Sequence, residues 1–409
     1  MKKYILIFCF LFFLLNNANG AVVKVEKKPD GWQLSVDGED YFIKGVSYSP
    51  SKIGESPDEG NLRDWMMIDD DKDGRIDVAY QSWIDKNRNN KKDSNEPEVG
   101  DFQLLKEMGV NTIRIYHHAT GNPEIQKIYR HINTYNHPPN KVILKDLYEK
   151  YGIRVMMGDF LGAYTIGSGA EWKDGTDYTD LQQRENMLKS VEDMVAEFKE
   201  EPFLLMWALG NDNNNEESRT NASMEPLAYA TFVNEVAKRI HELDPHHPVV
   251  LVNCETMLLD IYAQHTPDID IIGINSFRTV PGFGTLFHEV ATKYDKPLLI
   301  TAYGTQRPLI VDNELDEINQ MQVHIDSWRD ISNQKAGKNK PGNTIGGFAF
   351  EWMDTWWRNW NPGQHNLSQD GWHLEWHGIV SQGNGQHSLL LRQLRNVYFA
   401  YQEMWTKEN

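Results

Sequence analysis

The chain has 409 residues and a formal net charge of −18 at pH 7, a length that fits two average domains or one large α/β barrel. An acidic protein repels nucleic acid and anionic membrane surfaces, so neutral polymers such as glycans are the expected partners.

Residues 1–20 have the pattern of a secretory signal. Two lysines precede an apolar run at 4–15, and small residues stand before Ala21. The run is too short to span a membrane comfortably, which argues against the alternative of an uncleaved anchor helix. We therefore expect a secreted or periplasmic protein with no stable membrane insertion after cleavage. Cys9 would leave with the signal, and Cys254 would remain as a buried strand residue without a disulfide partner.

Residues 22–43 alternate between apolar and polar around two turn signals, which predicts a β-hairpin that caps the bottom of the following domain. Eight apolar runs after it are predicted strands. They are YFIKGV (41–46), NTIRIY (111–116), IRVMM (153–157), FLLMW (203–207), VVLVN (249–253), DIIGIN (270–275), KPLLIT (296–301) and GGFAF (346–350).

Helical periodicity separates most of these runs and is clearest at 184–200. The other predicted helices are 101–108, 141–150, 225–243, 285–294, 315–331 and 387–405. Strands that alternate with helices indicate a parallel sheet, and eight such units indicate a closed (β/α)8 TIM barrel. An open doubly wound sheet is the alternative, but no glycine-rich phosphate loop supports it. We expect one domain over 21–409, in which the hairpin caps the barrel.

Three connections are too long to be simple turns: 50–100, 158–183 and 351–386. Each follows the carboxyl end of a predicted strand. Because barrels place their sites at that end, these long βα loops are expected to surround the functional site.

The first of these connections is an acidic insertion in which oxygen-bearing side chains alternate as in calcium loops. Two copies of the pattern are present, and a solvated acidic loop is the alternative reading. We expect at least one structural Ca²⁺ and no metal or other cofactor for catalysis. The candidate ligands are Asp69, Asp71, Asp73 and Asp77 in the first copy, and Asp85, Asn87, Asn89, Asp93 and Glu96 in the second.

The strand ends resemble those of the family 2 and clan A glycoside hydrolases. The matching stretches are FIKGVSYSP (42–50), LLKEMGVNTIRIYHH (104–118), MWALGND (206–212), DIIGINSF (270–277), KPLLITAYG (296–304) and GGFAFEWMDTWW (346–357). Such enzymes are retaining glycosidases, with a proton-donating glutamate after strand 4 and a nucleophilic glutamate after strand 7. The resemblance thus implies a TIM barrel that recognises a β-linked glycan.

The resemblance assigns a role to several residues at the mouth of the barrel. Asp212 stands at the acid/base position, one methylene shorter than glutamate, and Ala302 stands at the nucleophile position. Phe277 replaces a tyrosine whose hydroxyl serves the nucleophile. The implied substrate-binding residues are Arg114, His117, Asn211, Asn275, Phe277 and Tyr303. A methyl group cannot attack an anomeric carbon, so the three changes together indicate that two-step retention has been abandoned.

Another carboxylate could in principle act as the base of an inverting reaction. Glu351 is the first choice among candidates that include Asp159, Glu255, Asp354 and Glu375. For each of them a structural role, or a contact with a sugar hydroxyl, is the favoured reading. A zinc role for His117 and His118 is not favoured, because no third ligand stands at a suitable spacing.

Tryptophans concentrate in the last connection, where indole faces could stack on sugar rings. Six lie between 352 and 376: Trp352, Trp356, Trp357, Trp360, Trp372 and Trp376. We expect two or three of these to line the site, with Trp352, Trp356 and Trp357 as the candidates. Trp172 or Tyr164 is expected to join them.

Two hypotheses follow from the sequence. The first is a secreted glycan-binding protein on a glycosidase barrel that has lost retaining hydrolysis. The second is an active O-glycosidase or transglycosylase that uses Asp212 as the acid and Glu351 as the base.

Overall fold

The computed structural model describes residues 20–129, 135–278, 282–311, 314–337, 342–358, 374–384 and 389–407. The predicted signal lies outside these residues except for Gly20. Within the described ranges, no helix is both long enough and apolar enough to cross a membrane.

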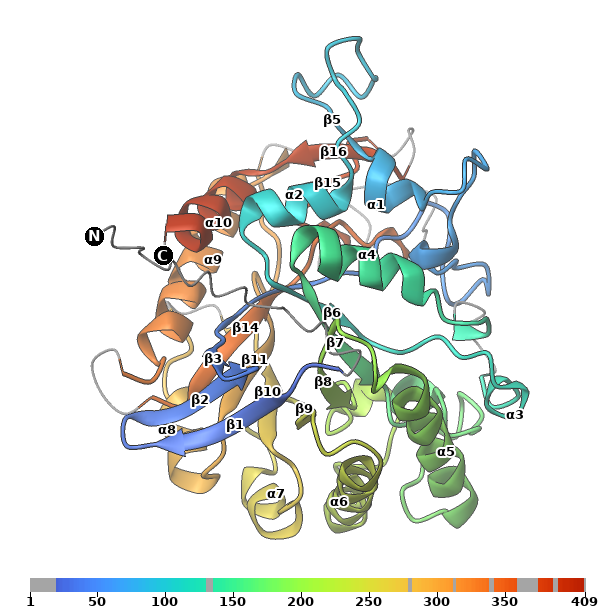
Figure 1. The fold of residues 1–409 in the computed structure, drawn as a ribbon, viewed down its shortest axis with the longest axis vertical. Helices are drawn as coiled ribbons and strands as arrows, with labels where there is room; N and C mark the ends of the chain where they lie inside the picture. Colours follow the sequence, from blue (N-terminus) through green and yellow to red (C-terminus); the bar gives the residue numbers. More distant parts are fainter. Residues whose placement is uncertain are drawn as a thin grey trace, which may run out of the picture.

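Eight parallel strands close into a barrel, as the sequence predicts (Figure 1). In chain order they are β4 (Ile43–Ser47), β6 (Thr112–Ile115), β7 (Arg154–Asp159), β8 (Leu204–Leu209), β9 (Val249–Cys254), β10 (Ile271–Asn275), β11 (Leu298–Tyr303) and β14 (Thr344–Ala349). β14 pairs with β4 and closes the ring. Most strand residues are buried because helices cover the outside and side chains fill the inside, which explains the continuous apolar runs.

Helices form the outer ring of the barrel (Figure 1). They are α2 (Asp101–Met108), α4 (Lys141–Tyr151), α5 (Leu181–Phe198), α6 (Pro226–Leu243), α7 (Leu259–His265), α8 (Leu286–Lys293), α9 (Glu317–Asn333) and α10 (Asn396–Lys407). In α5 the Asp180 side chain accepts a hydrogen bond from the Gln183 amide and caps the amino end. Met187, Val191 and Met194 then form its buried face.

The helix predicted at 387–405 is wrong at its amino end. Residues Leu391–Leu394 form strand β16, which pairs with β5 (Trp83–Ile84) and β15 (Val380–Ser381), and the helix begins only at Asn396. Pairing with distant segments overrides the local helical pattern here. β16 thereby ties the carboxyl-terminal part of the chain to the acidic insertion.

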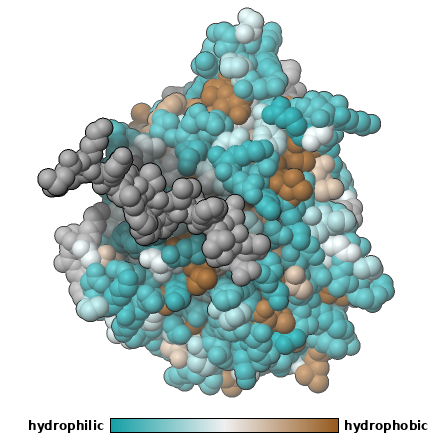
Figure 2. Space-filling model, viewed as in Figure 1, coloured by the Kyte–Doolittle hydropathy of each residue, from teal (hydrophilic) through white to brown (hydrophobic). Residues whose placement is uncertain are grey.

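The amino-terminal segment closes one end of the barrel. Strands β1 (Val23–Lys28), β2 (Gly31–Val36) and β3 (Glu39–Asp40) form an antiparallel sheet, which confirms the predicted hairpin and adds a third strand. Leu34 packs in one cluster with Met156 and Leu205 from inside the barrel. The sheet lies across the barrel opening in Figure 1. The face in the same view is mostly hydrophilic, with small separate apolar patches (Figure 2).

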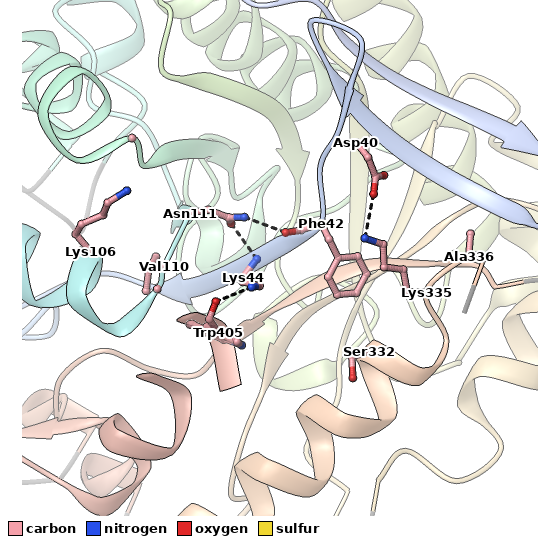
Figure 3. A pocket seen from close by; sticks show the side chains of 13 residues that line it. Asp40, Phe42, Lys44, Lys106, Val110, Asn111, Ser332, Lys335, Ala336 and Trp405 are labelled. Atoms are coloured by element: carbon pink, nitrogen blue, oxygen red, sulfur yellow. Dashed lines mark hydrogen bonds and ion pairs between the residues drawn. The ribbon is translucent and has the colours of Figure 1, made fainter. Parts of the chain in front are cut away.

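A cavity of about 680 Å³ lies at the amino-terminal end of the strands (Figure 3). Two of its three lysines are engaged with the protein. The Lys44 ammonium donates to the Trp405 carbonyl at 2.7 Å, and Lys335 is 3.0 Å from Asp40. Because the ends of the strands that carry Asp212 and Ala302 lie at the opposite face, this cavity is not the candidate active site.

Candidate active site

A hydrogen-bonded cluster at the carboxyl ends of the strands forms the floor of the site. Arg114, at the end of β6, donates to Asn211 Oδ1 at 2.8 Å and to Asn275 Oδ1 at 3.1 Å. Asn275 Nδ2 in turn donates to Asn211 Oδ1 at 2.9 Å. Three predicted substrate-binding residues from distant parts of the chain therefore meet in one cluster.

The Arg114 guanidinium is a buried charge without a salt bridge to any described residue. It is 1% exposed, donates to the carbonyl of Thr301 at 2.8 Å and lies 4.2 Å from the centroid of the Tyr116 ring. Its Nε is buried without a hydrogen-bond partner. Burial lowers the pKa of Arg114, although the charge of Asp212 raises it. The next residue on β11 is Ala302, whose methyl group lines the cleft. A carboxylate is thus absent at the position where a glutamate would offset the buried charge.

Asp212 follows β8 in a tight turn that side chains hold in place. The Asn213 carboxamide accepts from the Asn211 amide at 2.6 Å and donates to the Leu161 carbonyl at 3.0 Å. A side chain at Gly210 would meet the Asn213 oxygen at 2.6 Å, so only glycine fits there. Asp212 adopts φ of 58°, a left-handed conformation that aspartate tolerates. The sequence analysis did not single out Asn213, whose importance depends on this tertiary contact.

Asp212 can carry a proton near neutral pH. Burial raises its pKa to about 6, while the hydrogen bond from Asn275 and the charge of Arg114 lower it and the charges of Glu217 and Glu255 raise it. The Asn275 bond to Asp212 Oδ1 is 3.0 Å long. A carboxyl group with a raised pKa is suited to donate a proton or a hydrogen bond to a sugar oxygen.

This pKa predicts how stability depends on pH. Because it is higher in the folded chain than the usual unfolded value, Asp212 contributes stability in acid that is lost as the pH rises through about 6. Asp212→Asn does not titrate and keeps an oxygen for Asn275. We expect the variant to gain stability relative to the wild type from pH 4 to 7, by up to about 3 kcal/mol. Urea unfolding of both proteins at pH 4, 5 and 7 measures this, and a constant difference would contradict it.

Most of the alternative carboxylates are engaged by nearby side chains. The Glu255 carboxylate accepts from Arg278 Nη2 at 2.7 Å and from Ser276 Oγ at 2.6 Å. Asp354 is paired with Arg395, Asp159 accepts from Ser190, and Glu375 accepts from Trp376. These contacts agree with the structural role favoured for these four residues.

Glu351 differs from these carboxylates. Like Glu255 it lines the cleft, but its Oε1 is buried without a hydrogen-bond partner. Burial raises its pKa, although the Arg358 guanidinium, 3.8 Å from its Oε2, lowers it. Glu351 is therefore a buried carboxyl at the cleft, one oxygen of which has no hydrogen-bond partner.

The cleft has a volume of about 1020 Å³ and is bounded by all three long connections. Its aromatic lining is extensive: Trp65, Tyr116, Tyr135, Phe160, Tyr164, Trp172, Phe277, Phe350 and Trp357. Both Trp172 and Tyr164, expected as alternatives, take part. Phe277 packs edge-on against Phe350 with ring centroids 5.3 Å apart, so the missing tyrosine hydroxyl is replaced by an apolar contact.

Three predicted substrate-binding residues do not line the cleft, and these predictions are corrected. Tyr303 lies on the opposite face of β11 from Ala302, because side chains alternate along a strand, and its hydroxyl accepts a hydrogen bond from Tyr401. Trp352 packs against Tyr398. Trp356 is 2% exposed and is not among the residues that line the cleft. Trp376 is buried over Arg395. Trp360 and Trp372 lie outside the described residues.

His117 lines the cleft as predicted, above a buried cluster with His118 and Asp159. Its Nδ1 accepts from the Phe160 amide at 3.1 Å, so the other ring nitrogen, Nε2, carries the proton and is a buried donor without a partner. Burial lowers the pKa of His117 to about 3, which keeps the ring neutral. His118 and Asp159 are hydrogen-bonded to protein groups, so the cluster has a structural explanation without a metal.

Several cleft residues were not among the predicted site residues, and four of them carry side chains relevant to chemistry or binding. Arg63 and Trp65 come from the acidic insertion, and Arg358 follows Trp357. Cys254 is half-buried at the end of β9 and lines the cleft, which corrects its prediction as a purely buried strand residue. Burial raises the pKa of its thiol to about 12, so the thiol is not a nucleophile.

Comparisons with known proteins place the chain in a family. The model of the glycosyl hydrolases family 2 TIM barrel domain matches residues 85–309. The β-glucuronidase of Sus scrofa is 23% identical over 270 residues, which are 61% of this chain and 34% of that protein; that of Felis catus is also 23% identical over the same shares. The chain thus spans about a third of the length of these relatives.

Solved structures show the same fold. The β-D-glucuronidase of Dictyoglomus thermophilum superposes with a TM-score of 0.58 at 15% identity, over 95% of this chain and 54% of that one. A family 2 β-galacturonidase of Eisenbergiella tayi bound to galacturonate gives 0.54 at 13% identity, over the same shares. The matched family domain contains six of the eight barrel strands, β6 to β11, together with residues 212 and 302. The chain therefore belongs to glycosyl hydrolase family 2 and contains the TIM barrel domain of that family.

Proposed function

We propose that this protein is a secreted glycan-binding protein that uses a family 2 barrel without retaining hydrolysis. The observation that carries the proposal is the floor of the cleft, where Ala302 stands beside the buried and unpaired Arg114 guanidinium. A retaining reaction needs two carboxyl groups about 5 Å apart across the glycosidic bond. Asp212 can supply one of them, and position 302 cannot supply the other.

The lining of the cleft supports a β-linked oligosaccharide or polysaccharide as the ligand. Aromatic faces stack on the C–H faces of pyranose rings, while Asn211, His117 and Asp212 offer hydrogen-bonding groups at the floor. A cleft of about 1020 Å³ is at the upper end of the usual range for small-molecule sites, which suits more than one sugar unit.

The charge of the cleft favours a neutral glycan over a uronate, although the relatives are named for glucuronides and galacturonides. Seven acidic residues line it: Asp58, Glu59, Asp64, Asp212, Glu217, Glu255 and Glu351. The lining arginines are already paired. Arg63 contacts Glu55 and Asp70 at 2.7 Å each, and Arg358 lies near Glu351. A ligand carboxylate would therefore be repelled.

A binding and turnover panel tests the proposal. The purified chain is mixed with β-glucans, mannans, galactans, xylans and a β-glucuronide, while calorimetry follows binding and a reducing-end assay follows cleavage. We expect binding to a neutral glycan without turnover. Trp172→Ala should weaken it about tenfold, because a partly exposed stacking face is lost. Trp32→Ala, at the closed end of the barrel, is the matched control and should have no effect. Turnover that Asp212→Asn abolishes would overturn the proposal.

Glu351 keeps an active O-glycosidase or transglycosylase as the second candidate. Its unpartnered Oε1 in the cleft is the observation that favours this reading, with Asp212 as the general acid and Glu351 as the base. The same panel decides it: this candidate requires turnover that is lost in both Asp212→Asn and Glu351→Gln.

A further inference from the structure

The two acidic loops of the insertion share one backbone conformation. Lys72 and Arg88 have φ of 60° and 55°, and Gly74 and Asn90 have φ of 85° and 62°, at equivalent positions of the two loops. In the first loop the Asp73 amide donates to Asp69 Oδ1 at 3.1 Å; in the second the Asn89 amide donates to Asp85 Oδ1 at the same distance. In both loops most carboxylate oxygens accept N–H groups; both oxygens of Asp69, for example, accept from the Asp73 and Gly74 amides. The loops differ in whether a buried carboxylate oxygen is left without a hydrogen-bond donor.

The second loop, which projects beyond β5 at the top of Figure 1, is satisfied by the protein. Both oxygens of Glu96 accept backbone amides, from Lys86 at 2.7 Å and from Asp93 at 3.0 Å. Asp85 Oδ2 accepts from the Asn90 amide and from Gln393 Nε2, each at 2.8 Å. These N–H groups occupy the oxygens that a cation would need.

The first loop brings three carboxylates together and leaves one buried carboxylate oxygen without a hydrogen-bond donor. Oxygens of Asp69, Asp71 and Asp77 lie within 4.8 Å of one another. Asp77 is only 5% exposed, and its Oδ1 is buried without a hydrogen-bond partner. A buried carboxylate grouped with two other carboxylates is stabilised by a cation between them.

The Gln81 side chain lies beside the same group of carboxylates and carries a further oxygen. Its amide nitrogen donates to Asp71 Oδ2 and Asp73 Oδ2 at 3.0 Å each. A rotation of the amide by half a turn would place its oxygen there instead. Gln81 and Asp77 both belong to α1 (Asp77–Gln81) and compensate for Tyr80, which stands where a calcium loop has a glutamate. An all-oxygen set of this kind suits Ca²⁺ rather than Zn²⁺.

We propose that Asp69, Asp71 and Asp77 form a calcium site that fixes one wall of the cleft. Asp70, between two of the ligands, binds Arg63 of that wall at 2.7 Å and donates its amide to Asp77 Oδ2 at 3.2 Å. Arg63 precedes the 3-10 helix η1 (Trp65–Met67). Trp65 of this helix packs against Tyr48, with ring centroids 4.8 Å apart. An ion bound to Asp69 and Asp71 would therefore fix the position of Asp70. Through the ion pair between Asp70 and Arg63 it would also fix the cleft wall.

Calcium titration of the full chain by calorimetry tests the site itself. We expect one bound Ca²⁺, with affinity reduced at least about tenfold in Asp77→Asn and in the more exposed Asp71→Asn, since each removes a charged ligand. Asp93→Asn makes the same change in the second loop and should bind Ca²⁺ like the wild type. Absence of Ca²⁺ binding, or loss in Asp93→Asn with retention in both first-loop variants, would overturn the proposal.

Amide hydrogen exchange tests the effect on the cleft wall without any glycan. We expect exchange in residues 55–68 to slow by about tenfold in Ca²⁺ relative to a chelator, and by less in Asp71→Asn. Equal exchange in both conditions would refute the coupling. The importance of this wall for glycan binding rests on the proposed function, so a failure of the glycan panel and a failure of this measurement are separate results.

Discussion

Ala302→Glu combined with Asp212→Glu and Phe277→Tyr is expected to give the protein β-glycosidase activity on the glycan that it binds. A glutamate at 302 would enter the cleft beside Arg114, whose Nε lacks a partner and whose Nη1 already contacts the Thr301 carbonyl. Asp212→Glu restores the reach of the acid/base residue. The two carboxyl groups would then meet the requirement of a retaining reaction. We expect reducing ends to appear on the order of 1000-fold faster than with the wild type.

The matched control for this experiment is the same triple variant with Ala302→Gln. Glutamine has the size of glutamate but no carboxylate, so it should gain no activity. Ala302→Glu alone should also stabilise the fold by about 1 to 3 kcal/mol, because an unpaired buried charge gains its partner. Urea unfolding measures that gain. If the triple variant is inactive although Ala302→Glu raises the free energy of unfolding, the cleft no longer presents a glycosidic bond to these groups.

Asp354→Asn is expected to lower the free energy of unfolding by about 3 to 5 kcal/mol, because it leaves the Arg395 charge buried and unpaired. Both side chains are almost fully buried, and two hydrogen bonds of 2.8 and 2.7 Å join them. Asp354 Oδ1 also accepts from the Gly378 amide at 3.0 Å. Urea unfolding measures the loss.

The pair also matters for the cleft, because Asp354 lies three residues after Glu351 and three before Trp357. Glycan affinity should therefore fall together with stability. Asp326→Asn is the control: Asp326 and Arg329 are 3.9 Å apart on an exposed face, so its effect should stay within about 0.5 kcal/mol. Equal effects of the two substitutions would contradict the importance assigned to the buried pair.

The sequence by itself determined the barrel and the chemistry of its strand ends. All eight strands were predicted, since strands buried on both faces are apolar throughout and the helices between them show a clear period. The loss of a nucleophile at 302 was also visible, since it depends only on which side chain is present.

Only the tertiary structure decided which groups face the cleft with free atoms. Asp354 and Glu255 look like candidates in the sequence, and each is engaged by an arginine from another segment, 41 and 23 residues away. The two acidic loops look alike as well, and they separate because a buried oxygen of Asp77 lacks a donor in the first, whereas both oxygens of Glu96 accept backbone amides in the second. The local sequence determines where a strand forms and which side chain stands at its end. Partners from distant parts of the fold determine whether the charge of that side chain is satisfied.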